Sequence, residues 1–177
     1  MTKSVRLEWT SPAPYNGLER SNYPGFYCIT TVYKGQPSKL LYIGYSYDGT
    51  IKSRLSDHNS GWFDKYRGIR ISFARILPEL HKELSEEDVK SIENAMIYAY
   101  NPYENTQGKN NLKGEFAYHR FIIKNCGNIP YGFSPTLDMT ELLHNPKLNI
   151  QASKPRKSVT KNKSRRLFRR IAKGLLK

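Results

Sequence analysis

The strongest strand signal in the chain is Phe26-Tyr-Cys-Ile-Thr-Thr-Val-Tyr33. Its β-branched and aromatic residues predict a β-strand. The turn-like Lys34-Gly-Gln-Pro-Ser38 follows it, and Leu40-Leu-Tyr-Ile-Gly-Tyr-Ser-Tyr47 predicts a second strand. We expect these two strands to pair as a β-hairpin.

Two tyrosines and a glycine stand out on this hairpin. Side chains alternate along a strand, so Tyr27 should point away from the face that carries Phe26. On the second strand Tyr42 should share a face with Leu40 and Gly44. A glycine inside a strand indicates a bulge or a close backbone approach, so the two tyrosines near Gly44 could present their phenol hydroxyls to a ligand.

The elements expected after the hairpin are two helices and one more strand. Thr50 can cap a short helix from Ile51 to about His58, and alternating apolar residues predict a strand from Ile69 to Leu77. Ser85 precedes an acidic first turn and predicts a helix over 86–100. The predicted order is therefore β-β-α-β-α.

Length and composition limit the classes of protein that the chain can be. Its 177 residues suit one compact domain with an appendage, and a formal net charge of +14 favours a nucleic acid or an anionic membrane surface as partner. No apolar stretch approaches the ~20 residues of a transmembrane helix, so we expect no integral membrane association. Two cysteines exclude a disulfide scaffold and a multi-cysteine zinc module, and a reducing, cytoplasmic location is expected.

The positive charge is concentrated in the last segment of the chain. Residues 151–177 hold six Lys and five Arg with no acidic residue, and residues 153–164 are polar enough to predict a disordered linker. Apolar residues at helical intervals over 165–177 predict a basic amphipathic helix. Three uses of this helix stay open: binding to nucleic acid, binding to anionic lipid, or docking on the core. For the first use, the nucleic-acid-binding residues would be Arg165, Arg166, Arg169, Arg170 and Lys173.

The chain divides into four expected regions. Residues 1–23 are rich in Pro, Asn, Gly and Ser and predict an irregular N-terminal arm, and residues 24–115 carry the expected catalytic domain. Residues 116–150 form a C-terminal extension of the core, whose aromatic start does not distinguish a helix from a strand. Residues 151–177 are the basic linker and amphipathic helix.

Polar residues on expected apolar faces are the first functional signal. Ile51, Arg54, Leu55 and His58 lie on one stripe of the short helix. Because Ile51 and Leu55 should face the core, Arg54 and His58 are drawn to the same side or its rim. Such an Arg needs an anionic partner, although a structural ion pair or a long side chain that reaches water explains the pattern equally.

The second signal lies on the later helix. Glu93 falls four residues after Val89 and three before Met96, inside the apolar stripe. Carboxylates seldom occupy such positions without an Arg, a hydrogen-bond network or a metal. A structural pairing with Arg54 or Arg75 stays open, but an Arg, a His and a Glu on inward faces together suggest a site for a phosphate and a divalent cation.

These residues together resemble the GIY-YIG nuclease family. Gly25-Phe-Tyr27 is similar to its first tripeptide, with Phe in the middle position, and Tyr42-Ile-Gly44 is similar to its second. The similarity covers about half the chain, from Pro24 to Gln107. The other residues of the ordered set are Arg54 with His58 on the first helix, Glu93 in Ser-Ile-Glu-Asn-Ala, and Asn105 in Asn-Pro-Tyr-Glu-Asn.

The resemblance implies a fold and a reaction. The fold class is α+β, a small three-stranded antiparallel sheet with flanking helices, here followed by the basic C-terminal tail. The reaction is metal-dependent hydrolysis of DNA phosphodiesters, with Glu93 as the protein ligand of Mg²⁺ or Mn²⁺. Tyr27 would be the general base or orient the attacking water, and Arg54 would neutralise charge on the phosphoryl oxygens. Tyr42 and His58 would hold the nucleophile or share the proton transfer, and Asn105 would bind the phosphate or brace the site.

Several alternatives remain within and beyond this resemblance. Restriction enzymes and phage or mobile-element nucleases of this size are not separated by the sequence. The rival class is a catalytically inactive, basic nucleic-acid-binding protein. The expected partner is DNA, and a homodimer is left open.

Overall fold

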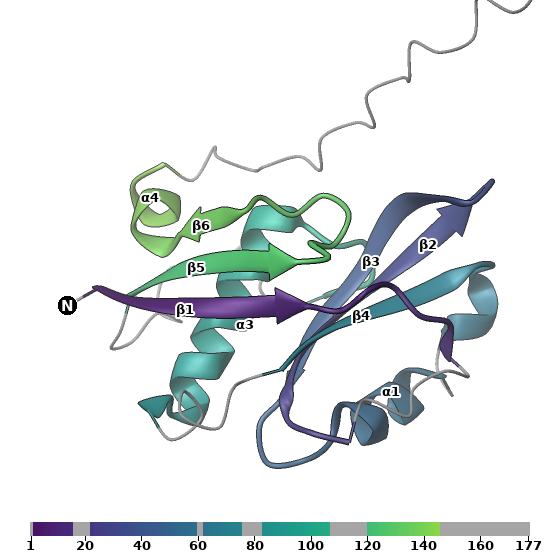
Figure 1. Cartoon of the computed structure of the whole chain (residues 1–177), viewed down its shortest axis with the longest axis horizontal. Coiled ribbons are helices and arrows are strands. Elements are labelled where there is room, and N and C mark those ends of the chain that lie inside the picture. The colour runs from purple at the N-terminus through teal and green to yellow at the C-terminus, as the bar shows by residue number, and fades with distance from the viewer. Residues whose placement is uncertain (1, 16–21, 60–61, 76–82, 107–119, 146–177) are drawn as a thin grey trace, which may run out of the picture.

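The computed structural model describes residues 2–15, 22–59, 62–75, 83–106 and 120–145 (Figure 1). Residues 151–177, with the five expected nucleic-acid-binding residues, lie outside this description. The helices and strands are β1 Thr2–Trp9, β2 Gly25–Tyr33, β3 Gln36–Ser46, α1 Ile51–Asn59, the short 3₁₀ helix η2 Phe63–Lys65, β4 Ile69–Arg75, α3 Glu86–Tyr100, β5 Arg120–Gly127, β6 Thr136–Asp138 and α4 Met139–His144.

The strands form one curled, mixed sheet in the order β3-β2-β4-β1-β5-β6 (Figure 1). The expected small three-stranded antiparallel sheet is therefore wrong as a description of the fold. β2 pairs antiparallel with β3 and β4, but β4 also pairs with β1, and β1 runs parallel to β5. The sheet is twice as wide as expected because chain segments far from the hairpin in sequence add three strands to it.

The prediction of an irregular N-terminal arm over residues 1–23 is also wrong for its first part, because Thr2–Trp9 forms the strand β1. Val5, Leu7 and Trp9 are buried at alternate positions of β1, and the residues between them are exposed. This alternation suits a strand with one face on the core. The strand is held along its length by β5, and the indole nitrogen of Trp9 donates to the Asn125 side-chain oxygen at 2.8 Å.

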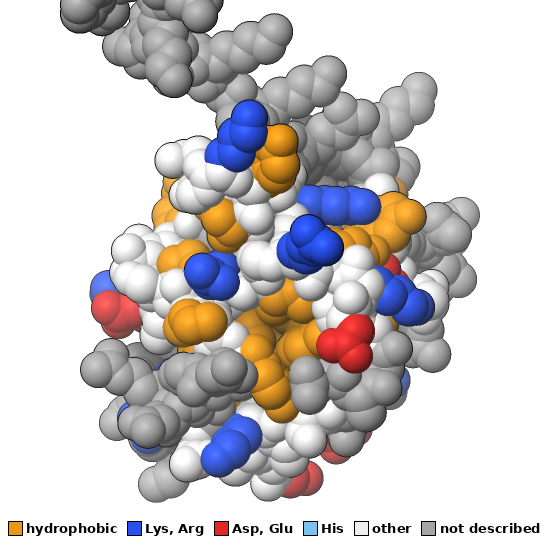
Figure 2. All heavy atoms as spheres, turned by 90° about the vertical axis from the view of Figure 1, so that its right-hand side faces the viewer, with side chains coloured by type: hydrophobic (Ala, Val, Ile, Leu, Met, Phe, Trp, Pro, Cys, Tyr) orange, Lys and Arg blue, Asp and Glu red, His pale blue; other side chains and the backbone are white. Residues whose placement is uncertain are grey.

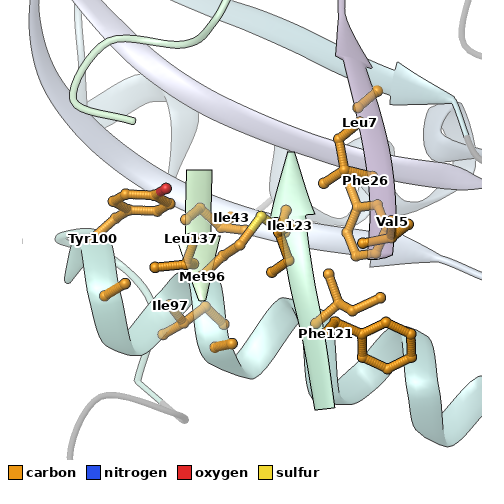
Figure 3. Packing of buried hydrophobic residues seen from close by; sticks show 14 of the residues in the cluster. Val5, Leu7, Phe26, Ile43, Met96, Ile97, Tyr100, Phe121, Ile123 and Leu137 are labelled. Carbon is orange, nitrogen blue, oxygen red and sulfur yellow. The ribbon is translucent and has the colours of Figure 1, made fainter. Parts of the chain in front are cut away.

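The sheet separates two clusters of buried side chains. One cluster joins β1, β2, β3 and β5 to α3, and Figure 3 shows part of it, with Val5, Phe26 and Met96 among the packed residues. The other cluster contains Tyr27, Ile29 and Phe73 and packs against α1. The two helices therefore cover opposite faces, and Tyr27 does point away from the face of Phe26, as the strand period predicts.

A β-bulge changes the faces of β3. Ile29 pairs with Tyr42 and Thr30 with Leu40, so Leu41 is the extra residue. Leu40 consequently packs with the α3 cluster, whereas Tyr42 lies against the α1 cluster. The prediction that Tyr42 shares a face with Leu40 is wrong for this reason.

Both expected helices form. Ile51 and Leu55 of α1 are fully buried, as their spacing predicts, but Arg54 is exposed at the rim rather than turned into the core. α3 spans the predicted residues, and its start is fixed by a capping box in which Ser85 and Asp88 each bond the backbone of the other. Within the described ranges, no helix is long and apolar enough to cross a membrane.

Candidate active site at the edge of the sheet

Gly44 lies beneath the two tyrosines of the hairpin motif on the α1 face. Tyr27 pairs with Gly44 across β2 and β3. A Cβ atom on Gly44 would overlap the Cζ and Oη atoms of Tyr27 and would lie 2.8 Å from Cε1 of Tyr42. The absence of a side chain at Gly44 is therefore what allows both phenol rings to lie over the strand, as a glycine inside a strand suggests.

The two phenols form a stacked and hydrogen-bonded pair. Their ring centroids are 6.0 Å apart with an interplanar angle of 19°. Tyr27 is fully buried and Tyr42 half-buried, so Tyr42 is the phenol nearer to solvent. Burial raises the pKa of Tyr42, and the Glu93 carboxylate raises it further, while Arg54 and the hydrogen bond with Tyr27 lower it. At neutral pH the Tyr42 phenol therefore keeps its proton and can donate a hydrogen bond.

Glu93 and Arg54 approach this pair from opposite sides of the sheet. Glu93 lies half-buried on α3, and Arg54 lies exposed on α1. Both act electrostatically on Tyr42, and both also act on Tyr45. β3 is the edge strand of the sheet, and both helices contact it.

Tyr45 is the residue of this cluster that sequence reasoning missed. Burial raises its pKa, and the carboxylates of Glu93 and Glu86 raise it further, whereas Arg54 lowers it. Tyr45 pairs with Phe26 and so lies on the face opposite to Tyr42. The alternation of side chains along β3 places these two tyrosines on different faces of the sheet. The charges of Glu93 and Arg54 nevertheless act on both phenols, and β3 is the edge strand.

Asn105 braces the strand that carries the site. Its side-chain oxygen accepts from the backbone N–H of Ile43 at 2.9 Å, and its side-chain nitrogen donates to the carbonyl of Ile43 at 2.9 Å. Ile43 is the residue between Tyr42 and Gly44, so the buried amide of Asn105 fixes the backbone at the centre of the second tripeptide. The resemblance implies that Asn105 either binds the phosphate or braces the site. These two hydrogen bonds to the backbone of β3 are the contacts that bracing requires.

His58 belongs to α1, but its side chain lies outside the part that the structure describes. Tyr27, Tyr42, Arg54, Glu93 and Asn105 therefore are the predicted site residues whose surroundings are known. The structure joins Tyr27 and Tyr42 through stacking and a hydrogen bond, Arg54 and Glu93 act on Tyr42 through their charge, and Asn105 holds the backbone of β3 beside Tyr42.

The fit of this site to a divalent cation depends on one carboxylate. Within the described residues, no group of three or more His, Cys, Asp or Glu side chains is arranged to hold a metal ion. Mg²⁺, however, typically keeps several waters and binds through one or two carboxylates together with phosphate oxygens of a substrate. Glu93, a half-buried carboxylate whose charge acts on Tyr42 and Tyr45, can supply that one ligand.

Comparison with protein-family models, with curated proteins and with solved structures gives no match for this chain.

Proposed function

We propose that this protein is a metal-dependent DNA endonuclease that hydrolyses phosphodiester bonds, as the resemblance of its motifs to GIY-YIG nucleases suggests. The observation that carries the proposal is that Arg54 of α1 and Glu93 of α3 both act electrostatically on Tyr42 of the edge strand β3. A phenol, a guanidinium and a carboxylate supply a hydrogen-bond donor, a cation for phosphate oxygens and a ligand for a divalent cation.

The roles of the residues follow from burial and charge. Glu93 would hold Mg²⁺ or Mn²⁺, and a bound divalent cation polarises the phosphate and stabilises its developing charge. Arg54 is exposed and can pair with phosphoryl oxygens. Tyr42 faces solvent and would position the attacking water, and His58 on the same helix as Arg54 would assist the proton transfer. Tyr27, being fully buried, would orient the Tyr42 phenol through their hydrogen bond.

The rival proposal is a catalytically inactive, basic nucleic-acid-binding protein. The residue that separates the two proposals is Glu93, because a metal-dependent nuclease requires a carboxylate ligand and a binding protein does not. DNA is the partner in both proposals, and the cytoplasmic location expected from the two free cysteines applies to both.

The test is cleavage of supercoiled and linear DNA by the full-length protein with Mg²⁺, with Mn²⁺ and with chelator. We expect nicking or cutting that requires the metal. Glu93→Gln should lower the cleavage rate by at least roughly a hundredfold with little change in DNA affinity, because it removes the metal ligand and keeps the side-chain shape.

Glu87→Gln is the matched control, since Glu87 is an exposed carboxylate in the first turn of the same helix. It should cleave like the wild type. Full activity of Glu93→Gln would remove Glu93 from the site. Metal-independent binding of DNA without any cleavage by the wild type would favour the inactive binding protein.

A further inference from the structure

Aromatic side chains lead away from Tyr42, first on the α1 face of the sheet and then beside its edge strand β3. We call Trp62, Tyr66 and Tyr103 the aromatic strip. The Trp62 ring lies 6.1 Å from the ring of Tyr42 and 5.8 Å from that of Tyr66, centroid to centroid, the latter pair at 88°. The Tyr66 hydroxyl donates to the carboxylate of Glu104, the residue next to Tyr103.

The far end of the strip is held rigidly at the edge of the sheet. The backbone N–H groups of Tyr103 and Glu104 donate to the carbonyls of Leu40 and Leu41 at 3.2 and 2.7 Å. The neighbouring Asn105 continues this edge through its two bonds to β3. The backbone that carries the far end of the strip is therefore fixed to β3, which lowers the ordering cost for a ligand that binds there.

The strip is accessible from solvent. Trp62 and Tyr66 are half-buried, and Tyr103 is 59% exposed, one of two large hydrophobic side chains that are exposed in the described part of the chain. Figure 2 views the end of the molecule where β2 turns into β3, and it shows hydrophobic side chains gathered in the middle with Lys and Arg around them. Such an arrangement suits a ligand with both apolar faces and negative charge.

One cation lies over a ring of the strip, and two more neighbour another ring in the sequence. The Lys39 ammonium lies 3.1 Å from the Tyr103 ring centroid. Lys65 and Arg67, both exposed, precede and follow Tyr66 in the sequence. Asp64 and Glu104 offset part of this charge, and Glu104 already accepts a hydrogen bond from Tyr66. The strip is thus only moderately basic, and its rings are its main binding feature.

We propose that the aromatic strip binds unpaired nucleotides of the DNA strand on one side of the cleaved phosphate, with Trp62 stacking on the base nearest Tyr42. The inference rests on the proposed nuclease function, because the strip begins at the proposed active site. Bases stack on aromatic side chains whatever their identity, and cations beside the rings pair with the phosphates between the bases. In a duplex the base faces are covered by neighbouring bases, so the ligand must be a single-stranded segment.

The test compares two oligonucleotides of equal length and charge in chelator, where no cleavage takes place. One is oligothymidylate, and the other is the same backbone with abasic sites. The full-length wild type should bind oligothymidylate roughly tenfold more tightly or better, a difference that stacking of one base can supply. Binding should also quench the fluorescence of the half-buried Trp62, whereas Trp9 is buried in the core.

Tyr103→Ala and Trp62→Leu should each reduce the preference for bases at least threefold and leave the affinity for the abasic backbone unchanged. Tyr131→Ala is the matched control, because Tyr131 is a half-buried tyrosine between β5 and β6, at the opposite end of the sheet from β3. It should keep the full preference. Tyr103 is mostly exposed, so its variant should fold, and thermal melting checks that both variants do.

Equal affinity of the wild type for the two oligonucleotides would overturn the strip as a nucleotide site. An unchanged preference in folded Tyr103→Ala and Trp62→Leu would overturn it as well, as would tighter binding of duplex than of single strand. These measurements need no catalysis. Base-dependent binding without metal-dependent cleavage would therefore remove the nuclease function and keep the strip.

Discussion

At the scale of single residues, Gly44 controls the site more directly than any charged group. Its position opposite Tyr27 leaves space that the Tyr27 phenol fills completely. The ring is fully buried between β2 and β3 and α1, so it cannot swing away as a flexible side chain would. The free energy of unfolding and the arrangement of the two phenols therefore both depend on the absence of a side chain at Gly44.

We expect Gly44→Ala to lower the free energy of unfolding by about 1–3 kcal/mol, the usual cost of overpacking a buried site. It should also lower cleavage by more than the remaining folded fraction explains, because the displaced Tyr27 no longer supports Tyr42. Denaturant unfolding and cleavage rates measure the two effects. Gly49→Ala is the control, since its added Cβ would lie 3.3 Å from the Ser46 hydroxyl and would overlap no ring.

A Gly44→Ala variant with normal stability and normal activity would contradict both the overlap and its role. Gly44 could be singled out from the sequence because a glycine interrupts an otherwise apolar and aromatic strand. The pairing of Gly44 with Tyr27 could not be derived from the sequence, because the bulge at Leu41 shifts the register of the hairpin. No local sequence pattern predicts that bulge.

At the scale of elements, the sequence predicts the helices and strands whose apolar residues recur at a regular spacing. The stripe of Val89, Ile92 and Met96 predicts α3, and the acidic turn after Ser85 predicts where it begins. β1 is not predicted although Val5, Leu7 and Trp9 alternate, because the prolines that follow favour an irregular segment. Its pairing with β5 connects residues far apart in the chain, which no local window contains.

The edge strand β3 is held by the side chain of Asn105, which bonds both backbone groups of Ile43. Asn105→Ala would leave the backbone N–H and C=O of Ile43 without their partner, and each unpaired buried group costs about 1–3 kcal/mol. We expect a lower free energy of unfolding and fast hydrogen exchange of the Ile43 amide, measured by NMR. Asn128→Ala, a change of an exposed asparagine, should alter neither.

Cleavage by Asn105→Ala separates bracing from phosphate binding. If Asn105 only braces β3, the DNA affinity of the folded variant should stay unchanged while its cleavage rate falls. A protected Ile43 amide together with a large loss of DNA affinity would instead assign Asn105 to the phosphate.

At the scale of the whole molecule, charge and site are separated along the chain. Residues 151–177 carry eleven basic residues and no acidic ones, whereas the first 150 residues hold the other 18 basic residues and all 15 acidic ones. Every proposed catalytic residue and the whole aromatic strip belong to the first 150 residues. The proposed active site therefore belongs to the first 150 residues, and the basic segment holds most of the net charge.

Deleting residues 151–177 should weaken DNA binding and flatten its salt dependence, because each phosphate contact contributes about 0.9 to the slope of log K against log salt. Cleavage at saturating DNA and low salt should survive, and so should the preference for bases over the abasic backbone. If the segment instead docks its apolar stripe on the core, the deletion should lower the melting temperature by several degrees and leave the slope as it was. The salt slope and the melting temperature of the truncated protein, measured together, distinguish a DNA-binding segment from a structural one.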